Sequence, residues 1–218
     1  MTVELFAHPF SSYCQKAITA LHEHGLEWTL RMIEPGSEWM AEWESLWPIR
    51  RFPVLREGKR VVPEASAIIE HLHAHHRTAT PLIPDDPDQA VTVRMLDRFF
   101  DHYVSDPQTR IVRNALRPQD QRDPLAEPEA RALLDRAYAW LDGHMAGRTW
   151  AAGETFSMAD CAAAPSLFYA DWTHPLGDRF PHVSAYRARL LQRPAFSRAV
   201  DAARPHRHLF PLPVPDRD

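Results

Sequence analysis

The sequence predicts an α/β domain followed by an all-helical domain. Residues 3–76 alternate short apolar runs with helical periodicity in the order β-α-β-α-β-β-α. The proline-rich segment TATPLIPDDPD then interrupts the periodicity, and only helical spacing follows it. Glycine is scarce at 7 residues while proline reaches 20, a balance that favours helices ended by prolines over a turn-rich β-sandwich.

The chain begins with a predicted strand and helix. Val3–Ala7 is a short apolar run, and Ser12–His24 carries apolar residues at helical spacing up to Gly25, which ends the helix. A second strand is predicted at Glu27–Met32. The tryptophan-rich stretch Gly36–Trp47 is irregular and predicts a loose helix.

An antiparallel pair and a helix complete the first domain. Strands are predicted at Val54–Arg56 and Arg60–Val62, joined by Glu57-Gly58-Lys59, in which the glycine suits a tight turn. Ala65–His76 follows with one apolar helical face.

The proline-rich segment places the domain boundary. We predict a first domain at 1–78, a linker at 79–88 and a helical domain with a proline-rich tail at 89–218.

A central helix is expected in the second domain around Met95 to Tyr103, because its apolar stripe is too wide for a one-faced surface helix. Asp106-Pro107 should kink or break it before Ile111 resumes the pattern. Further helices are predicted at 129–145, 158–172, 182–191 and 195–203, and the prolines after Pro205 cannot continue a helix.

Composition excludes several function classes. The net charge of -4 and the pI near 6.3 disfavour nucleic acid and an anionic membrane as partners. No signal segment and no run of about 18 apolar residues is found, so a soluble cytoplasmic protein is expected. Two cysteines, Cys14 and Cys161, are too few for a disulfide scaffold and wrongly spaced for zinc.

Four histidines, His71, His73, His75 and His76, resemble a metal cluster, and His71 and His75 would share a helical face. No acidic or cysteine partner is apparent for them, so a solvated helix end is the favoured interpretation. We therefore expect no metal.

The segment FSSYCQK, residues 10–16, lies where the first strand ends and the first helix begins. A helix N-terminus offers unpaired N–H groups and a partial positive charge, so it can hold a thiolate. For a serine at such a turn, an ordinary N-cap is the commoner role.

Two further motifs are also ordinary when taken singly. In WPIRRFPVL, residues 47–55, a proline precedes a strand, and in VPEASAII, residues 62–69, an acidic residue starts a helix. Each has a purely structural explanation.

Together, in this order and spacing, the three motifs resemble the cytosolic glutathione transferase family, with a serine-type, theta-, omega- or zeta-like bacterial-style site. The family pattern is a catalytic Ser, Tyr or Cys opening the first helix, a cis-proline loop, and an E-S-x-A-I helix start. AGETFSMAD, residues 152–160, similarly resembles the family's capping box, in which Ser157 and Asp160 satisfy each other's backbone donors. The resemblance implies a thioredoxin-like first domain, a helical-bundle second domain, a homodimer and a detoxification role.

The resemblance also implies site residues. Ser11 is expected to stabilise the thiolate of glutathione, and Ser12 is the second candidate for this role. Phe52 before a cis-Pro53 would pair its backbone with the cysteinyl part, Arg51 would face the glycine carboxylate, and Glu64 would take the γ-glutamyl ammonium. Ala65 stands where the family has serine, and the serine of this chain, Ser66, comes one position later. The backbone N–H groups of residues 65 and 66 are therefore expected to hold the γ-glutamyl carboxylate. The site for an electrophilic substrate is expected to be lined by Phe10, Tyr103, Phe168 and Trp172.

The implied reaction is attack by glutathione thiolate on a small, largely apolar electrophile. Two alternatives stay open: a glutathione-dependent isomerase or reductase, and a catalytically silent binding or regulatory protein of the same fold. The first is disfavoured because zeta-like members expect S-S-C-S and omega-like members expect cysteine where Ser11 stands. Cys14, in the place of the second cysteine of a C-x-x-C motif, is interpreted as structural.

Overall fold

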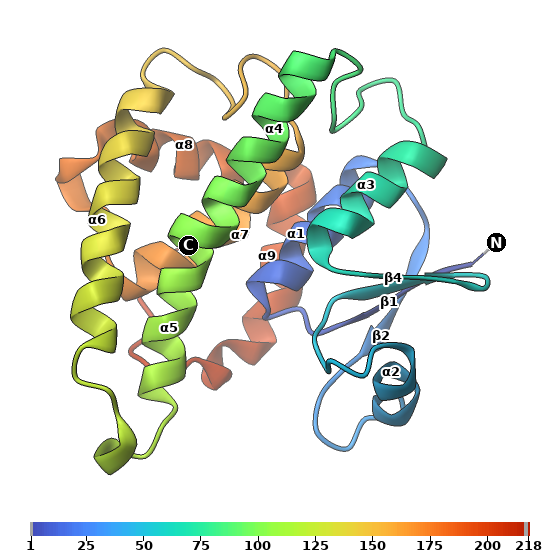
Figure 1. Ribbon diagram of the computed structural model, residues 1–218, viewed down its shortest axis with the longest axis horizontal. Coiled ribbons are helices and arrows are strands. Elements are labelled where there is room, and N and C mark those ends of the chain that lie inside the picture. The colour runs from blue at the N-terminus through green and yellow to red at the C-terminus, as the bar shows by residue number, and fades with distance from the viewer. Residues whose placement is uncertain (1, 216–217) are drawn as a thin grey trace.

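The computed structural model describes residues 2–215 and 218. Its first domain holds a four-stranded mixed sheet in the order β2-β1-β3-β4. Strand β1 pairs in parallel with β2 and antiparallel with β3, and β3 and β4 form an antiparallel hairpin (Figure 1). The strands are β1 (Val3–Ala7), β2 (Trp28–Met32), β3 (Val54–Glu57) and β4 (Arg60–Pro63), and the helices are α1 (Ser12–Glu23), α2 (Met40–Leu46) and α3 (Ala65–His75). The predicted β-α-β-α-β-β-α order is confirmed.

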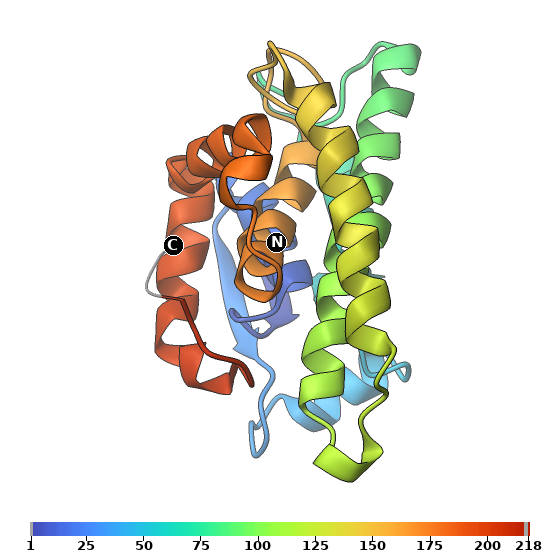
Figure 2. The same ribbon diagram turned by 90° about the vertical axis from the view of Figure 1, so that its left-hand side faces the viewer.

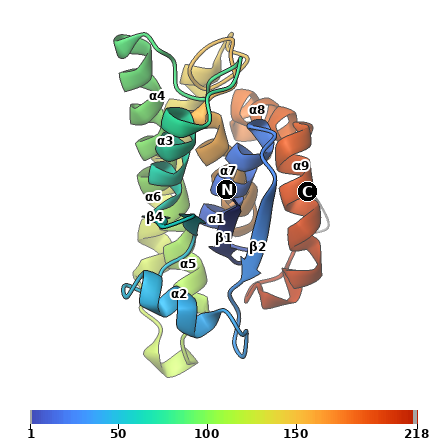
Figure 3. The ribbon, with the colours of Figure 1, turned by 90° about the vertical axis from the view of Figure 1, so that its right-hand side faces the viewer.

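Both faces of the sheet are covered because alternate residues of β1 point to opposite sides. Leu5 is buried in the large core that includes α1 and α3, whereas Phe6 packs with Trp43 of α2 in a smaller core. Figure 3 shows α2 set apart from α1 and α3. Helix α1 therefore lies between the sheet and the second domain, and its N-terminus opens at the junction.

The second domain starts with one long helical run of changing pitch. α4 (Pro87–Phe99) passes through a π-helical turn, η1 (Phe100–Ser105), into α5 (Asp106–Ala115). Pro107 has no N–H to donate and its ring crowds the preceding turn, and the wider π turn accommodates both effects. The predicted disturbance at Asp106-Pro107 is thus a local change of helix type and not a break.

Helix α7 (Met158–Thr173) packs against α1, the α4–α5 run and α8. Figure 2 shows α7 between α9 and the α4–α5 run. All 16 residues of α7 are buried, and the predicted capping box of Ser157 and Asp160 is confirmed at its start. The others are α6 (Ala126–Met145), α8 (Pro181–Leu191), α9 (Pro194–Ala203) and the 3₁₀ turns η2 (Gln119–Gln121), η3 (Gly177–Arg179) and η4 (Arg204–Leu209). In the described part of the chain, no helix has both the length and the apolar character needed to cross a membrane.

A buried group of charges joins the two domains. The Lys16 side chain of α1 is 1% exposed, and its Nζ lies 2.7 Å from Asp97 Oδ1 and 2.8 Å from Asp101 Oδ2. Ser66 of α3 and Arg98 of α4 complete this group, which we call the junction cluster. Burial raises the pKa of Asp97, and the Lys16 ammonium opposes that shift. A buried charge needs such partners because it has lost its hydration.

The junction cluster predicts a large difference between the chain's two lysines. Lys16→Met should lower the free energy of unfolding by about 3–5 kcal/mol, because it removes the buried ammonium that two buried carboxylates share. Lys59→Met, at an exposed position in the β3–β4 turn, is the matched control and should change the free energy of unfolding by about 0.5 kcal/mol or less. Urea unfolding of the three proteins measures both values. Equal unfolding midpoints for the two variants would contradict a stabilising role for the cluster.

Candidate active site

The N-terminus of α1 is the centre of the candidate site. Ser11 is the N-cap, and its Oγ accepts a hydrogen bond from Cys14 N at 3.4 Å. Because the oxygen is the acceptor in that contact, the hydroxyl hydrogen can still be donated to a ligand. Ser12 Oγ lies 3.5 Å from Ser105 Oγ of η1, so it faces the second domain. The two serines therefore differ in direction, although they are adjacent in sequence.

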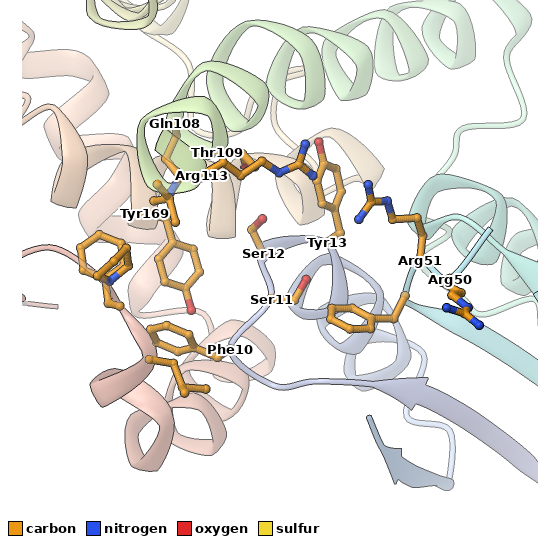
Figure 4. A pocket seen from close by; sticks show the side chains of 15 residues that line it. Phe10, Ser11, Ser12, Tyr13, Arg50, Arg51, Gln108, Thr109, Arg113 and Tyr169 are labelled. Atoms are coloured by element: carbon orange, nitrogen blue, oxygen red, sulfur yellow. Dashed lines mark hydrogen bonds between the residues drawn. The ribbon is translucent and has the colours of Figure 1, made fainter. Parts of the chain in front are cut away.

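The loop before β3 runs beside this helix end. The Phe52–Pro53 peptide bond is cis, as the family resemblance implied. Arg50 has a positive φ of 56°. The side chain of the next residue, Arg51, extends toward Tyr13 (Figure 4). Phe52 is part of every hollow described below.

Three hollows adjoin at Phe52, and Ser11 lines two of them. The first, the apolar hollow, has a volume of about 330 Å³ and lies between Ser11 and α5. The second, the polar hollow, has about 410 Å³ and is lined by Glu64, Arg98 and Asp101 among others. It shares Tyr13, Arg51, Phe52 and Arg113 with the apolar hollow. The third, the histidine hollow, has about 650 Å³ and is lined by His8, His206, His208 and Glu34.

Glu64 begins α3 at the edge of the polar hollow. Its φ of 73° is unusual for a residue with a Cβ, and strained backbone of this kind concentrates at functional sites. Its side chain is not used to cap α3 and is exposed. The carboxylate is therefore available to a ligand next to the helix N-terminus, where Ala65 is buried.

The hydroxyl of Ser66 is fully used within the protein. It accepts from Lys16 Nζ at 2.8 Å and from Arg98 Nη1 at 2.9 Å, and it donates to Asp97 Oδ2 at 2.9 Å. A hydroxyl has one hydrogen and two lone pairs, so no further strong contact remains. Ser66 can thus serve a ligand through its backbone N–H and not through its side chain.

The predicted aromatic lining is only partly present. Phe10 lines the apolar hollow, with Tyr169 edge-on to it at a ring separation of 5.5 Å. Tyr103 is 51% exposed and contacts Phe99, away from the described hollows. Phe168 and Trp172 are 2% and 6% exposed and belong to the core around α7. Tyr169 lines the hollow in place of these three predicted residues. Tyr103 lies on the exposed side of η1, and Phe168 and Trp172 belong to a helix that is buried on every side, whose periodicity cannot reveal which residue faces a cavity.

Sequence reasoning missed the residues that α5 and the tail contribute. Gln108, Thr109 and Arg113 of α5 line the apolar hollow, as do Leu209 and Phe210 of the tail. The polar residues of α5 were the available signal, since polar residues facing a neighbouring domain are candidates for ligand contact. The tail segment had no such signal, because its position across the site depends on Phe210 packing against Trp172 at a ring separation of 5.2 Å.

Neither cysteine is placed for chemistry. Cys14 and Cys161 are both buried and free. Burial raises the pKa of the Cys14 thiol to about 12 and raises that of Cys161 as well. Their thiols stay protonated at neutral pH, which agrees with the structural role expected for Cys14.

Two family matches cover most of the chain. Residues 5–80 match the family described as glutathione S-transferase, N-terminal domain, and residues 110–189 match glutathione S-transferase, C-terminal domain. Glutathione S-transferase 3 of Zea mays is 26% identical, over 98% of this chain and 96% of its own length. FtsZ-localized protein A of Caulobacter vibrioides is 31% identical, over 90% of each chain.

Solved structures agree with these matches. A glutathione S-transferase from Methylobacterium radiotolerans, in complex with glutathione sulfonate, superposes with a TM-score of 0.80 at 25% identity, over 92% of this chain and 95% of its own. Ure2p in complex with glutathione superposes with a TM-score of 0.82 at 20% identity, over 92% and 93% of the two chains. The thioredoxin-like first domain and the helical second domain are confirmed. This chain belongs to the glutathione S-transferase family.

Proposed function

We propose that the protein is a glutathione transferase in which Ser11 and the N-terminus of α1 stabilise the thiolate of bound glutathione for attack on a small, largely apolar electrophile. The observation that carries this proposal is the position of Ser11. It caps α1 and lines the apolar hollow, and the polar hollow adjoins that hollow at Tyr13 and Phe52, so a thiol held at Ser11 would lie between sites for two different partners.

The polar hollow suits a charged peptide such as glutathione. Glu64 supplies a carboxylate for the γ-glutamyl ammonium, and the N-terminus of α3 supplies N–H groups for the γ-glutamyl carboxylate. Arg51 is exposed, lines the same hollow and is our candidate for the glycine carboxylate. The backbone of Phe52 next to Pro53 would pair with the cysteinyl part. The bound peptide would then direct its thiol toward Ser11.

Thiolate stabilisation sets the energetic requirement. A thiol with a pKa near 8.5 is mostly protonated at neutral pH, and lowering that pKa by about two units takes roughly 2.7 kcal/mol. A hydrogen bond to a charged group contributes about 1.5–3 kcal/mol, and the helix dipole adds about 0.3–1 kcal/mol. Ser11 and the α1 terminus together are therefore sufficient without a general base.

The electrophile would bind in the apolar hollow. Phe10 and Tyr169 form its aromatic wall, and Leu209 and Phe210 of the tail cover it. Burial raises the pKa of Tyr169, whose hydroxyl contacts Gln15 Nε2 at 3.0 Å, so this group stays a neutral phenol. These walls favour a substrate with an apolar or aromatic body.

Two alternatives are weighed by specific observations. Thiol-based isomerase or reductase chemistry is disfavoured because a serine, Ser11, stands at the helix start and the neighbouring thiol, Cys14, is buried and protonated. A silent binding protein is favoured by the missing serine at Ala65 and the internal use of the Ser66 hydroxyl. One relative, FtsZ-localized protein A, is also named for a localisation and not for a reaction.

The first prediction concerns the bound thiol. In Ser11→Ala the pKa of bound glutathione should rise toward its free value, because the thiolate loses a charge-assisted hydrogen bond, and conjugation should slow by about 10- to 100-fold. Ultraviolet thiolate absorbance against pH measures the pKa. Ser12→Ala is the matched control and should leave it nearly unchanged. If the pKa of bound glutathione rises in Ser12→Ala and not in Ser11→Ala, Ser12 is the residue that stabilises the thiolate. If the pKa of glutathione bound to the wild type equals its free value, the protein is better described as a binding protein.

The second prediction concerns glutathione affinity. Glu64→Ala should weaken binding by about tenfold, because the γ-glutamyl ammonium loses its carboxylate. Titration calorimetry and retention on immobilised glutathione measure the effect. Glu38→Ala, at an exposed position before α2, is the control and should bind as the wild type does. If the wild type fails to bind at millimolar glutathione, the transferase proposal is wrong.

We also propose that the protein is a homodimer, as its family resemblance implied. Val91 and Met95, 64% and 48% exposed, lie one turn apart on α4, and Tyr103 continues this exposed apolar strip along η1. Burial against a second copy would remove the strip from water.

The dimer is tested by its mass in solution. Light scattering should give about twice the chain mass of 25.1 kDa for the wild type. Met95→Glu should shift the protein toward monomer, because a carboxylate without a partner is costly in an apolar interface. Leu116→Glu, at an exposed site beyond α5, should remain dimeric. A monomeric wild type would overturn this proposal.

A further inference from the structure

The end of α3 carries a polar cluster that the glutathione site does not use. His71 is 8% exposed on α3, and His76 caps the C-terminal end of that helix. The sequence alone indicated no acidic partner for these histidines. The structure supplies one, because Glu57 at the end of β3 lies beside them, 14 and 19 residues away in sequence.

The three side chains converge on one point. Glu57 Oε2 lies 2.8 Å from His71 Nε2, and Glu57 Oε1 lies 2.9 Å from His76 Nε2. All three candidate ligand atoms are within 4.8 Å of one another. The carboxylate is shared between two imidazoles and its side chain is only 13% exposed.

The contact with His76 has one unusual feature. His76 Nε2 is buried, and despite its short distance to Glu57 it has no hydrogen bond of acceptable geometry to any described residue. A buried ring nitrogen normally has a partner. A metal ion between the ring and the carboxylate would supply one.

We propose that Glu57, His71 and His76 form a site for a divalent metal ion, with zinc as the best fit. Two imidazoles and one carboxylate are an established zinc ligand set, with water in the fourth position. Ligand atoms around tetrahedral zinc are about 3.3 Å apart, given bonds of about 2.0–2.1 Å. To admit the ion, the carboxylate would need to move away from each of the two ring nitrogens by about 0.5 Å.

The site has a structural consequence for the first domain. Glu57 belongs to the β3–β4 hairpin and the histidines to the C-terminal end of α3, which lie on the same side of the molecule in Figure 1. None of the three residues lines the hollows around Ser11. The ion would therefore fasten the hairpin to the helix and stabilise the fold without taking part in glutathione chemistry.

A neighbouring histidine provides the matched control. The His75 ring is centred 4.6 Å from that of His71, but its Nε2 contacts the guanidinium of Arg60. A fixed positive charge at that nitrogen disfavours a cation there. His75→Ala should therefore retain metal binding, although it removes a histidine from the same helix.

The test uses the full-length protein without a histidine tag, stripped with EDTA and dialysed. Zinc chloride is titrated by calorimetry and in competition with a chromogenic chelator, and thermal unfolding is followed with and without zinc. We expect one zinc ion per chain and a higher unfolding midpoint with zinc. Glu57→Gln and His76→Ala should each weaken zinc binding by about tenfold or more. Cobalt(II) should give the visible absorbance of a tetrahedral site in the wild type and in His75→Ala.

Unfolding in metal-free buffer first establishes that each variant is folded. If Glu57→Gln does not fold, His76→Ala decides the question, because its ring lies at the end of the helix. The proposal is overturned if the wild type binds no zinc at micromolar concentration, or if both ligand variants bind it as the wild type does. It is equally overturned if binding is lost in His75→Ala or on replacement of His206 and His208. Glutathione binding by His76→Ala should be unchanged, which separates this site from the proposed transferase function.

Discussion

The ammonium of Lys16 lies between the carboxylates of Asp97 and Asp101, with almost no exposure to water. Lys16 is on α1, and the two aspartates are on α4 and η1, so this contact fixes the first helix of one domain against the α4–α5 run of the other. A buried charge tolerates little displacement, because each lost contact leaves an uncompensated ion. The N-terminus of α1, one turn away, is held in place by the same constraint.

That constraint also determines how the polar hollow can bind a ligand. Ser66 is part of the junction cluster, and its hydroxyl can form no further strong hydrogen bond. The start of α3 therefore presents backbone N–H groups and the Glu64 carboxylate instead of a serine side chain. Arg98 and Asp101 line the hollow and also belong to the cluster, so a bound peptide would contact the group that joins the domains. Ligand binding in this hollow would therefore be coupled to domain packing through these shared side chains.

The two ends of α3 have different chemistry. Its N-terminal end, next to Glu64, borders the polar hollow, where N–H groups and the helix dipole favour an anion. Its C-terminal end carries the histidines around Glu57, where the negative end of the dipole favours a cation. One helix thus separates the proposed glutathione site from the proposed metal site by its own length.

The element order and the ligand-facing motifs were predictable from sequence, because they depend on local patterns. Apolar spacing defined the strands and helices of the first domain, and the motifs around Ser11, Pro53 and Glu64 lie at element boundaries that such spacing reveals. The capping box of Ser157 and Asp160 is similarly local. The sequence pattern determined which backbone positions open helices and loops.

The tertiary structure alone decided which side chains meet. Tyr169 lines the apolar hollow while Phe168 does not, and the fully buried α7 has no polar face that distinguishes them. The use of Ser66 by Lys16, and of Glu57 by His71 and His76, joins residues that are 14 to 50 positions apart. Periodicity gives the direction of a side chain relative to its own helix or strand. The packing of one element on another, which buries apolar surface and pairs buried charges, decides what that side chain contacts.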